Sequence, residues 1–289
     1  VRELPSPTPC CYSGVHHPRQ KAVHYRKWRY NPRDGRQRAH LRPHVTADTT
    51  GLSPADLVIV QVKASASEAA LTKNKALIGP DTILMTLQNG MGHETLLSRF
   101  AAREQIVIGT TQQGSYKLGE TTVCHSGLGK TFLGTVTGDS SRFAPLAEMF
   151  AGCGFPCEVC SQVQGMIWDK LMINASSSVL SGILQVAQGY VEQESHAWTL
   201  AEKLIRELCA AATADGYPFD AEEQIARIRL HLQKAPDGFT SIYADLKAGR
   251  RTEVDVINGA VVEAGHRHNI PVPTHEFVVE LVHAMEGRA

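Results

Sequence analysis

Two short, apolar runs constrain the fold of this chain more than any other feature. Residues 57–62 read Leu-Val-Ile-Val-Gln-Val, and residues 82–87 read Thr-Ile-Leu-Met-Thr-Leu. Near-continuous apolar runs rich in β-branched side chains are typical of strands that are buried on both faces. A helical pattern at 66–77 separates the two runs, and a second one at 93–103 precedes a third apolar run at 106–109. This alternation predicts parallel βαβ units and therefore an α/β domain.

Polar side chains follow the first two predicted strands directly, Lys63 after one and Asn89 after the other. Ligands of open α/β sheets bind beyond the carboxyl ends of the strands, so both residues are candidate ligand contacts. A solvated loop position is the alternative for each. Residues 127–131 read Gly-Leu-Gly-Lys-Thr, but they lack the G-x-G-x-x-G spacing and do not link a strand to a helix. We therefore expect a hairpin turn there and not a phosphate-binding loop.

The formal net charge of zero hides an uneven distribution along the chain. Residues 1–44 hold 10 of the 29 Lys and Arg, 6 of the 14 Pro and only two acidic residues, Glu3 and Asp34. Three interpretations compete for this segment: a basic arm for nucleic acid, a disordered extension, or a stretch translated out of frame. The last fits its composition best. The overall balance argues against nucleic acid or an anionic membrane surface as the main partner, and no apolar run is long enough for a transmembrane helix.

The second half of the chain predicts an all-helical domain. Residues 171–191 carry no charge, as expected for a helix at the centre of a bundle. Lys170 and Asn174 lie four residues apart at its start and share one helix face. A lysine is almost never buried without a partner or a task. Further helices are predicted at 193–214, 221–234, 252–268 and 274–287.

Glu253 has two interpretations of equal weight. Thr252 suits the N-cap position of the helix at 252–268, which would place Glu253 in a first turn where the helix dipole favours acids. The alternative is a functional carboxylate.

Cys153, Cys157 and Cys160 form the one cluster among seven cysteines, and no histidine stands at ligand spacing nearby. We therefore expect no metal site, and buried thiols in a reducing cytoplasm.

Four motifs in order and in register resemble the ketopantoate reductase (2-dehydropantoate 2-reductase) family. They are DLVIVQVKA at 56–64, LQNGMG at 87–92, WDKLxxN at 168–174 and GRRTExDxxNG at 249–259. The resemblance implies an NADP-binding Rossmann-type domain, of which 45–163 would be the remainder. It also implies an all-α domain of the 6-phosphogluconate dehydrogenase type over 164–289, with the active site between the two. The implied reaction is the NADPH-dependent reduction of 2-dehydropantoate to pantoate, on the route to pantothenate and coenzyme A.

The same resemblance implies roles for individual residues. Lys170 matches the family's general acid, which polarises the ketone and protonates the alkoxide, and Glu253 matches its acidic partner in the cleft. The matched substrate-binding positions are Asn89, Asn174 and Ser241, and the matched cofactor-binding positions are Lys63, Asn89, Ser115 and Glu253. A small 2-oxo acid is thus the expected partner, and a homodimer is the assembly left open.

The chain departs from the family pattern at several positions. Ser178, Gln188 and Gly238 stand where asparagines are common, and Gln113 stands where a histidine is frequent, so another 2-oxo acid stays open as the substrate. Residues 1–44 contain no G-x-G-x-x-G turn, so we expect the first βαβ unit to be missing and a sheet edge to be exposed. A non-catalytic binding protein that has lost its cofactor site is the alternative of a different class.

Overall fold

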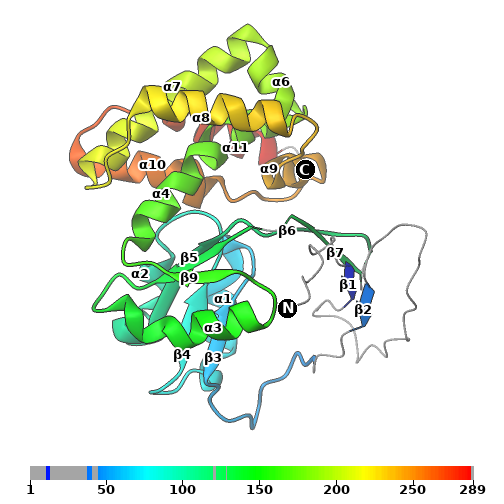
Figure 1. The fold of residues 1–289 in the computed structure, drawn as a ribbon, viewed down its shortest axis with the longest axis vertical. Helices are drawn as coiled ribbons and strands as arrows, with labels where there is room; N and C mark the ends of the chain where they lie inside the picture. The colour runs from blue at the N-terminus through cyan, green and yellow to red at the C-terminus, as the bar shows by residue number, and fades with distance from the viewer. Residues whose placement is uncertain (1–10, 14–37, 41–44, 120–121, 128, 288–289) are drawn as a thin grey trace, which may run out of the picture.

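The computed structural model describes residues 11–13, 38–40, 45–119, 122–127 and 129–287. Most of the segment 1–44 lies outside these residues, so the three hypotheses about it stay predictions. The described chain forms a sheet domain and a helical domain, which α4 (Val163–Ile173) connects (Figure 1).

The described strands form two sheets. Their bounds are β1 (Cys11–Ser13), β2 (Arg38–His40), β3 (Leu57–Val60), β4 (Ile83–Thr86), β5 (Ile106–Thr111), β6 (Gly114–Lys117), β7 (Val123–Gly127), β8 (Thr131–Gly134) and β9 (Cys157–Val159). The larger sheet has the order β3-β4-β5-β8-β9, and the smaller one has the order β2-β1-β7-β6. β3, β4 and β5 are parallel, whereas β8 runs antiparallel to β5. The parallel βαβ units confirm the predicted α/β domain.

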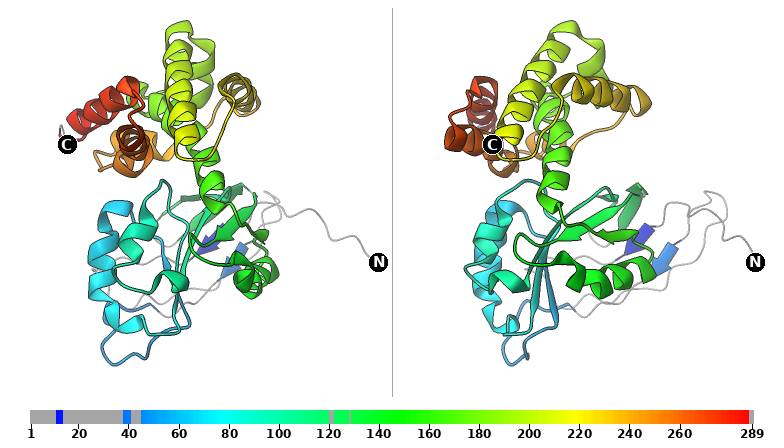
Figure 2. Two further views of the ribbon diagram at one scale, coloured as in Figure 1. Left: turned by 90° about the vertical axis from the view of Figure 1, so that its left-hand side faces the viewer. Right: turned by 60° about the vertical axis from the view of Figure 1, so that its left-hand side comes forward.

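Helices cover both faces of the larger sheet (Figure 2). On β4, Leu84 packs into a cluster with residues of α1 (Ser67–Lys73) and α2 (His93–Leu97). The next residue, Met85, packs with Phe143 and with α3 (Ala144–Gly152) on the opposite face. Neither Leu84 nor Met85 is exposed, which explains why the strand has no polar alternation.

β3 has a single neighbouring strand, β4, among the residues that the structure describes. Ile59 in the middle of β3 is 44% exposed, an unusual position for an isoleucine of a parallel sheet.

The predicted hairpin at 127–131 is wrong. β7 pairs with β6 and β8 pairs with β5, so this segment connects the two sheets.

The helical domain packs around one apolar core that includes Trp168 of α4 and Leu204 and Leu208 of α7. Its helices after α4 are α5 (Val179–Leu184), α6 (Gln188–Gln193), α7 (Ser195–Ala214), α8 (Ala221–Lys234), α9 (Ser241–Lys247), α10 (Val254–His268) and α11 (Pro273–Glu286). The uncharged stretch 171–191 is not one helix, because α5 ends at Leu184, where Gln185 adopts a left-handed conformation (φ +56°), and α6 begins at Gln188. Between α4 and α5 the helix continues through a π-helical turn, η5 (Asn174–Ser178). None of the described helices is long and apolar enough to cross a membrane.

Candidate active site

Lys170 lies in the last turn of α4, where this helix passes from the sheet domain into the helical domain (Figure 1). Trp168, Leu171 and Met172 of the same helix are buried and fix its position. The Lys170 Nζ donates a hydrogen bond to the Thr111 carbonyl at the end of β5, at 2.9 Å. Burial lowers the pKa of Lys170 to about 8, while the negative charge of Glu253 acts in the opposite direction. Lys170 is therefore an ammonium at neutral pH that loses its proton at a lower pH than an ordinary lysine.

Lys170 forms part of the wall of two cavities. One, of about 310 Å³, is also lined by Lys63, Asn89, Gln113 and Glu253. The other, of about 480 Å³, extends from Thr111 to Asn174 and is bordered by Arg227 and His231. Asn174 in turn lines a third cavity of about 180 Å³ together with Ser178, Gln188 and Ser241. The shared residues make the three cavities neighbours around Lys170 and Asn174.

Glu253 faces the cleft and does not act as a cap. It occupies the N-cap position of α10 without forming a side-chain cap, one residue after the predicted N-cap Thr252. The capping hydrogen bond does come from Thr252, whose Oγ1 accepts from the Val254 backbone N–H at 3.2 Å. Its carboxylate accepts from the Ala64 backbone N–H at 3.3 Å and from Asn89 Nδ2 at 3.5 Å, and Lys63 Nζ lies 3.7 Å away. These partners lie at the strand ends of the sheet domain, so Glu253 connects the two domains across the cleft.

Gly90 allows the loop that carries Asn89 to approach α10 closely. Its φ is +93°, and a Cβ at this position would lie 2.3 Å from the Val256 carbonyl oxygen. The next residue, Met91, donates its backbone N–H to the same oxygen at 2.9 Å. A side chain at residue 90 would therefore push the Asn89 loop away from Glu253.

Asp245 is a member of the site that was not predicted from the sequence. It lies on α9 and is 3% exposed. Its carboxylate accepts from Lys63 Nζ at 2.6 Å and from Arg250 Nε at 3.0 Å. The spacing of four residues from Ser241 on one helix face was the available signal, but an acid in a short helix is indistinguishable by pattern from a surface charge. In the structure, Asp245 holds Lys63 at the mouth of the cleft.

Replacing Asp245 by asparagine is expected to lower the free energy of unfolding by about 1–3 kcal/mol. This is below the ~3–5 kcal/mol expected for breaking a fully buried pair, because Lys63 is half exposed. Urea denaturation measures the change. The matched control is Glu158→Gln, which breaks an exposed pair with Lys130 of the same 2.6 Å length and should change the value by less than about 1 kcal/mol. Equal effects of the two variants would contradict a stabilising role of the Asp245–Lys63 ion pair.

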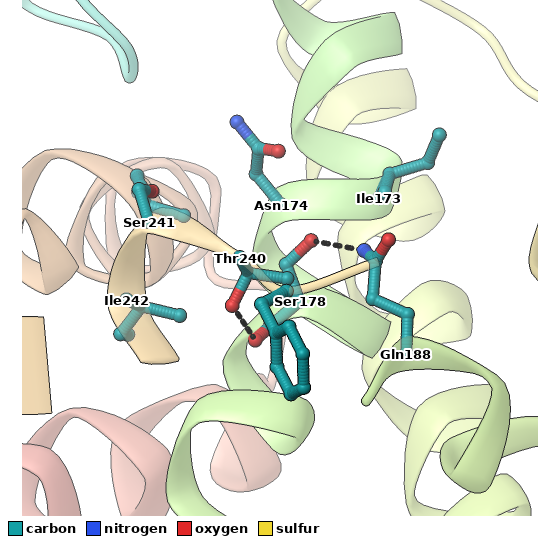
Figure 3. A pocket seen from close by; sticks show the side chains of 9 residues that line it. Ile173, Asn174, Ser178, Gln188, Thr240, Ser241 and Ile242 are labelled. Atoms are coloured by element: carbon teal, nitrogen blue, oxygen red, sulfur yellow. Dashed lines mark hydrogen bonds between the residues drawn. The ribbon is translucent and has the colours of Figure 1, made fainter. Parts of the chain in front are cut away.

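The smallest of the three cavities has polar and apolar walls (Figure 3). Ser178 Oγ accepts a hydrogen bond from Gln188 Nε2 at 3.2 Å, and the Ser178 carbonyl accepts from Thr240 Oγ1 at 3.3 Å. Asn174 and Ser241, by contrast, form no side-chain hydrogen bond with any residue that the structure describes. Ile173, Ile242 and Ile257 form the apolar walls. Two polar groups are thus free to bind a ligand, and the rest of the cavity suits apolar atoms.

The predicted residues do not all meet in one place. Lys63, Asn89, Lys170 and Glu253 line the same cavity, whereas Asn174 and Ser241 line the smallest one. Ser115 is exposed on β6 of the smaller sheet and lines none of these three cavities, so its role stays a prediction. Within the part of the chain that the structure describes, no group of His, Cys, Asp and Glu suits a metal ion.

Comparison with family models gives two matches that together span most of the chain. The model "Ketopantoate reductase PanE/ApbA" matches residues 15–138, and "Ketopantoate reductase PanE/ApbA C terminal" matches residues 162–286. The first match thus begins inside the segment 1–44.

Curated relatives and solved structures agree with these matches. The 2-dehydropantoate 2-reductase of Halobacterium salinarum is 30% identical over 251 residues, which cover 86% of this chain and 82% of that protein. The enzyme of the same name from Archaeoglobus fulgidus is 29% identical over 255 residues, with 88% and 83% coverage. A D-mandelate dehydrogenase, solved with NADH and anilino(oxo)acetate, superposes with a TM-score of 0.77 at 28% identity, covering 82% of this chain and 77% of that one. A PanE/ApbA family ketopantoate reductase from Ralstonia eutropha gives 0.74 at 28% identity, with 84% and 80% coverage.

Proposed function

This chain belongs to the ketopantoate reductase family, and from this premise we propose that it catalyses the NADPH-dependent reduction of 2-dehydropantoate to pantoate. Its relatives and structural neighbours are oxidoreductases. The seven cysteines are odd in number and scattered along the sequence, which fits a reducing compartment, and we place the enzyme in the cytoplasm, where it would serve the synthesis of pantothenate.

The observation that carries the proposal is the buried ammonium of Lys170 at the junction of the cavities. Its hydrogen bond goes to a backbone carbonyl, and no carboxylate of the described residues forms an ion pair with it. In the reduction, Lys170 would donate a hydrogen bond to the ketone oxygen and then transfer its proton to the alkoxide. The lowered pKa brings its acidity close to the operating pH, which is the condition for efficient proton transfer.

The residues of the 310 Å³ cavity fit the nicotinamide riboside end of a dinucleotide. Asn89 offers an amide group and Lys63 an ammonium at the carboxyl ends of the parallel strands where such cofactors bind, while the Gln113 amide is bonded to Gly129 and His125. The bound reduced nicotinamide supplies the hydride. Residues for the pyrophosphate and the adenosine are not identified among those that the structure describes, so NADPH rests on the family.

Asn174 and Ser241 are the residues that we assign to the substrate. Because both side chains lack protein partners within the described chain, they can bind the carboxylate or a hydroxyl group of a keto acid without breaking an existing bond. Glu253 would hold Asn89 and Lys63 in place and keep Lys170 protonated by its charge. This division of roles follows the residues that the family resemblance names.

A second candidate is the reduction of a 2-oxo acid with a larger apolar group. The isoleucine walls of the smallest cavity favour it, and so does the hydrogen bond by which Ser178 and Gln188 satisfy each other. The D-mandelate dehydrogenase among the structural neighbours was solved with anilino(oxo)acetate, an aromatic ligand.

The test is a matrix of steady-state assays on the purified full chain. NADPH and NADH are each combined with ketopantoate, phenylglyoxylate and pyruvate, and oxidation of the cofactor is followed. The proposal predicts the highest kcat/KM for NADPH with ketopantoate. A preference for phenylglyoxylate would select the second candidate. Absence of both turnover and cofactor binding would leave the non-catalytic alternative.

A further inference from the structure

The π-helical turn η5 carries two of the side chains that line the cavity assigned to the substrate. It begins at Asn174 and ends at Ser178, and both residues line the smallest cavity (Figure 3). π-helical turns are rare, and they are frequently found at functional sites. The direction of these two side chains therefore depends on how the turn is held.

Asn258 of α10 forms a hydrogen bond with the backbone of this turn. Its side-chain Nδ2 donates to the Ala175 carbonyl at 2.9 Å and lies 3.1 Å from His275 Nδ1 on α11. The other ring nitrogen of His275 is 3.0 Å from the Leu204 carbonyl of α7. Asn258 and His275 are completely buried. One chain of hydrogen bonds thus connects α7, α11, α10 and η5.

The donors and acceptors of this hydrogen-bonded series can be arranged in only one way. A carbonyl only accepts, so His275 Nε2 must carry the proton that bonds to Leu204. Burial lowers the pKa of His275 to about 4, so the ring is neutral and its Nδ1 accepts. Both hydrogens of the Asn258 amide are then used, one toward His275 and one toward Ala175. Rotating the amide by half a turn would direct its oxygen at two acceptors.

The polar chain is not explained by core stability. Buried polar groups lower stability unless they are all paired, and Asn258 Oδ1 is buried without a partner within the described chain. An apolar side chain at 258 would remove the unpaired Oδ1, but it would also take the donor away from the Ala175 carbonyl and from His275 Nδ1. What the amide supplies is a fixed direction for the Ala175 carbonyl, in the middle of the turn that carries Asn174 and Ser178.

We propose that Asn258 and His275 are positioning residues for the substrate pocket, which hold η5 so that Asn174 and Ser178 face the ligand. The identity of the ligand rests on the proposed function, but the geometry of the turn does not.

The kinetic test compares Asn258→Leu in two backgrounds. In the wild-type chain, the expected result is a rise in the KM for the 2-oxo acid of about tenfold, with kcat within about threefold, because the substrate contacts are displaced. In the Asn174→Ala/Ser178→Ala background, the same change should alter KM by less than about twofold, since the positioned side chains are gone. An unchanged KM, or equal factors in both backgrounds, would overturn the proposal. Thr82→Val, which removes a buried hydroxyl of the sheet domain, is the control and should leave KM unchanged.

A second measurement does not need turnover. Hydrogen exchange of the unliganded protein should show faster exchange at residues 174–179 in Asn258→Leu, with α8 unchanged. His275→Phe retains an aromatic ring but removes the Nδ1 acceptor and should give the same pattern if Asn258→Leu does not fold. Wild-type exchange rates at 174–179 in the folded variant would overturn the positioning role. If the wild-type chain lacks turnover, the proposed function fails, while the exchange data still decide this inference.

Discussion

Replacing Lys170 by methionine is expected to lower kcat for ketone reduction by about 10²–10⁴-fold, the usual contribution of a positioned general acid. Methionine keeps the length and most of the volume of the side chain but cannot donate a proton. KM should change much less, because the proposed substrate contacts come from Asn174 and Ser241. Stopped-flow and steady-state assays with saturating cofactor measure the effect.

Folding is the control for this variant. The lowered pKa of Lys170 shows that the folded chain disfavours the charged form, so removing the ammonium should leave the melting temperature unchanged or raise it. Lys203→Met, on the exposed face of α7, should leave both kcat and stability near the wild-type values. A kcat for Lys170→Met within tenfold of the wild type would remove Lys170 from the role of the acid.

Replacing Glu253 by glutamine is expected to lower kcat/KM at pH 8 by about 10²-fold, the scale for losing one preorganised electrostatic group. Two effects add. The negative charge that raises the pKa of Lys170 is lost, so a smaller fraction of Lys170 is protonated. The amide also binds Lys63 and Ala64 more weakly than the carboxylate does.

The matched control for Glu253→Gln is Glu263→Gln on the same helix. The side chain of Glu263 is 78% exposed and pairs only loosely with Arg267, so this change should leave the kinetics unaltered. A Glu253→Gln enzyme that retains wild-type activity at pH 8, and whose rate declines at the same pH as that of the wild type, would show that the carboxylate does not act on Lys170.

The sequence predicts the sheet domain well because its strands are buried on both faces. The runs at 57–62 and 82–87 became β3 and β4, and the alternation with helices fixed their parallel direction. The predicted hairpin at 127–131 failed because local glycines do not reveal that β7 and β8 belong to different sheets.

Long-range contacts account for what the sequence could not predict in the site. The spacing of Lys170 and Asn174 placed both on one helix face, but the π turn after Ile173 also contains Ala175, whose carbonyl accepts a hydrogen bond from Asn258, 83 residues further along the chain than Ala175. Asp245 was missed because its importance comes from Lys63, which is 182 residues away. The sequence could not distinguish a capping role from a functional role for Glu253. Its hydrogen bonds with Ala64 and Asn89 place its carboxylate in the cleft.

The role of Lys170 as the acid in ketone reduction is tested by the pH dependence of kcat/KM for 2-oxo acid reduction between pH 6 and pH 10. The reaction needs the protonated amine, and burial lowers its pKa to about 8. We expect kcat/KM to be level below that pH and to decline above it with a slope that approaches tenfold per pH unit. In Glu253→Gln the decline should begin at lower pH. A wild-type rate that stays level or rises up to pH 10 would contradict the account.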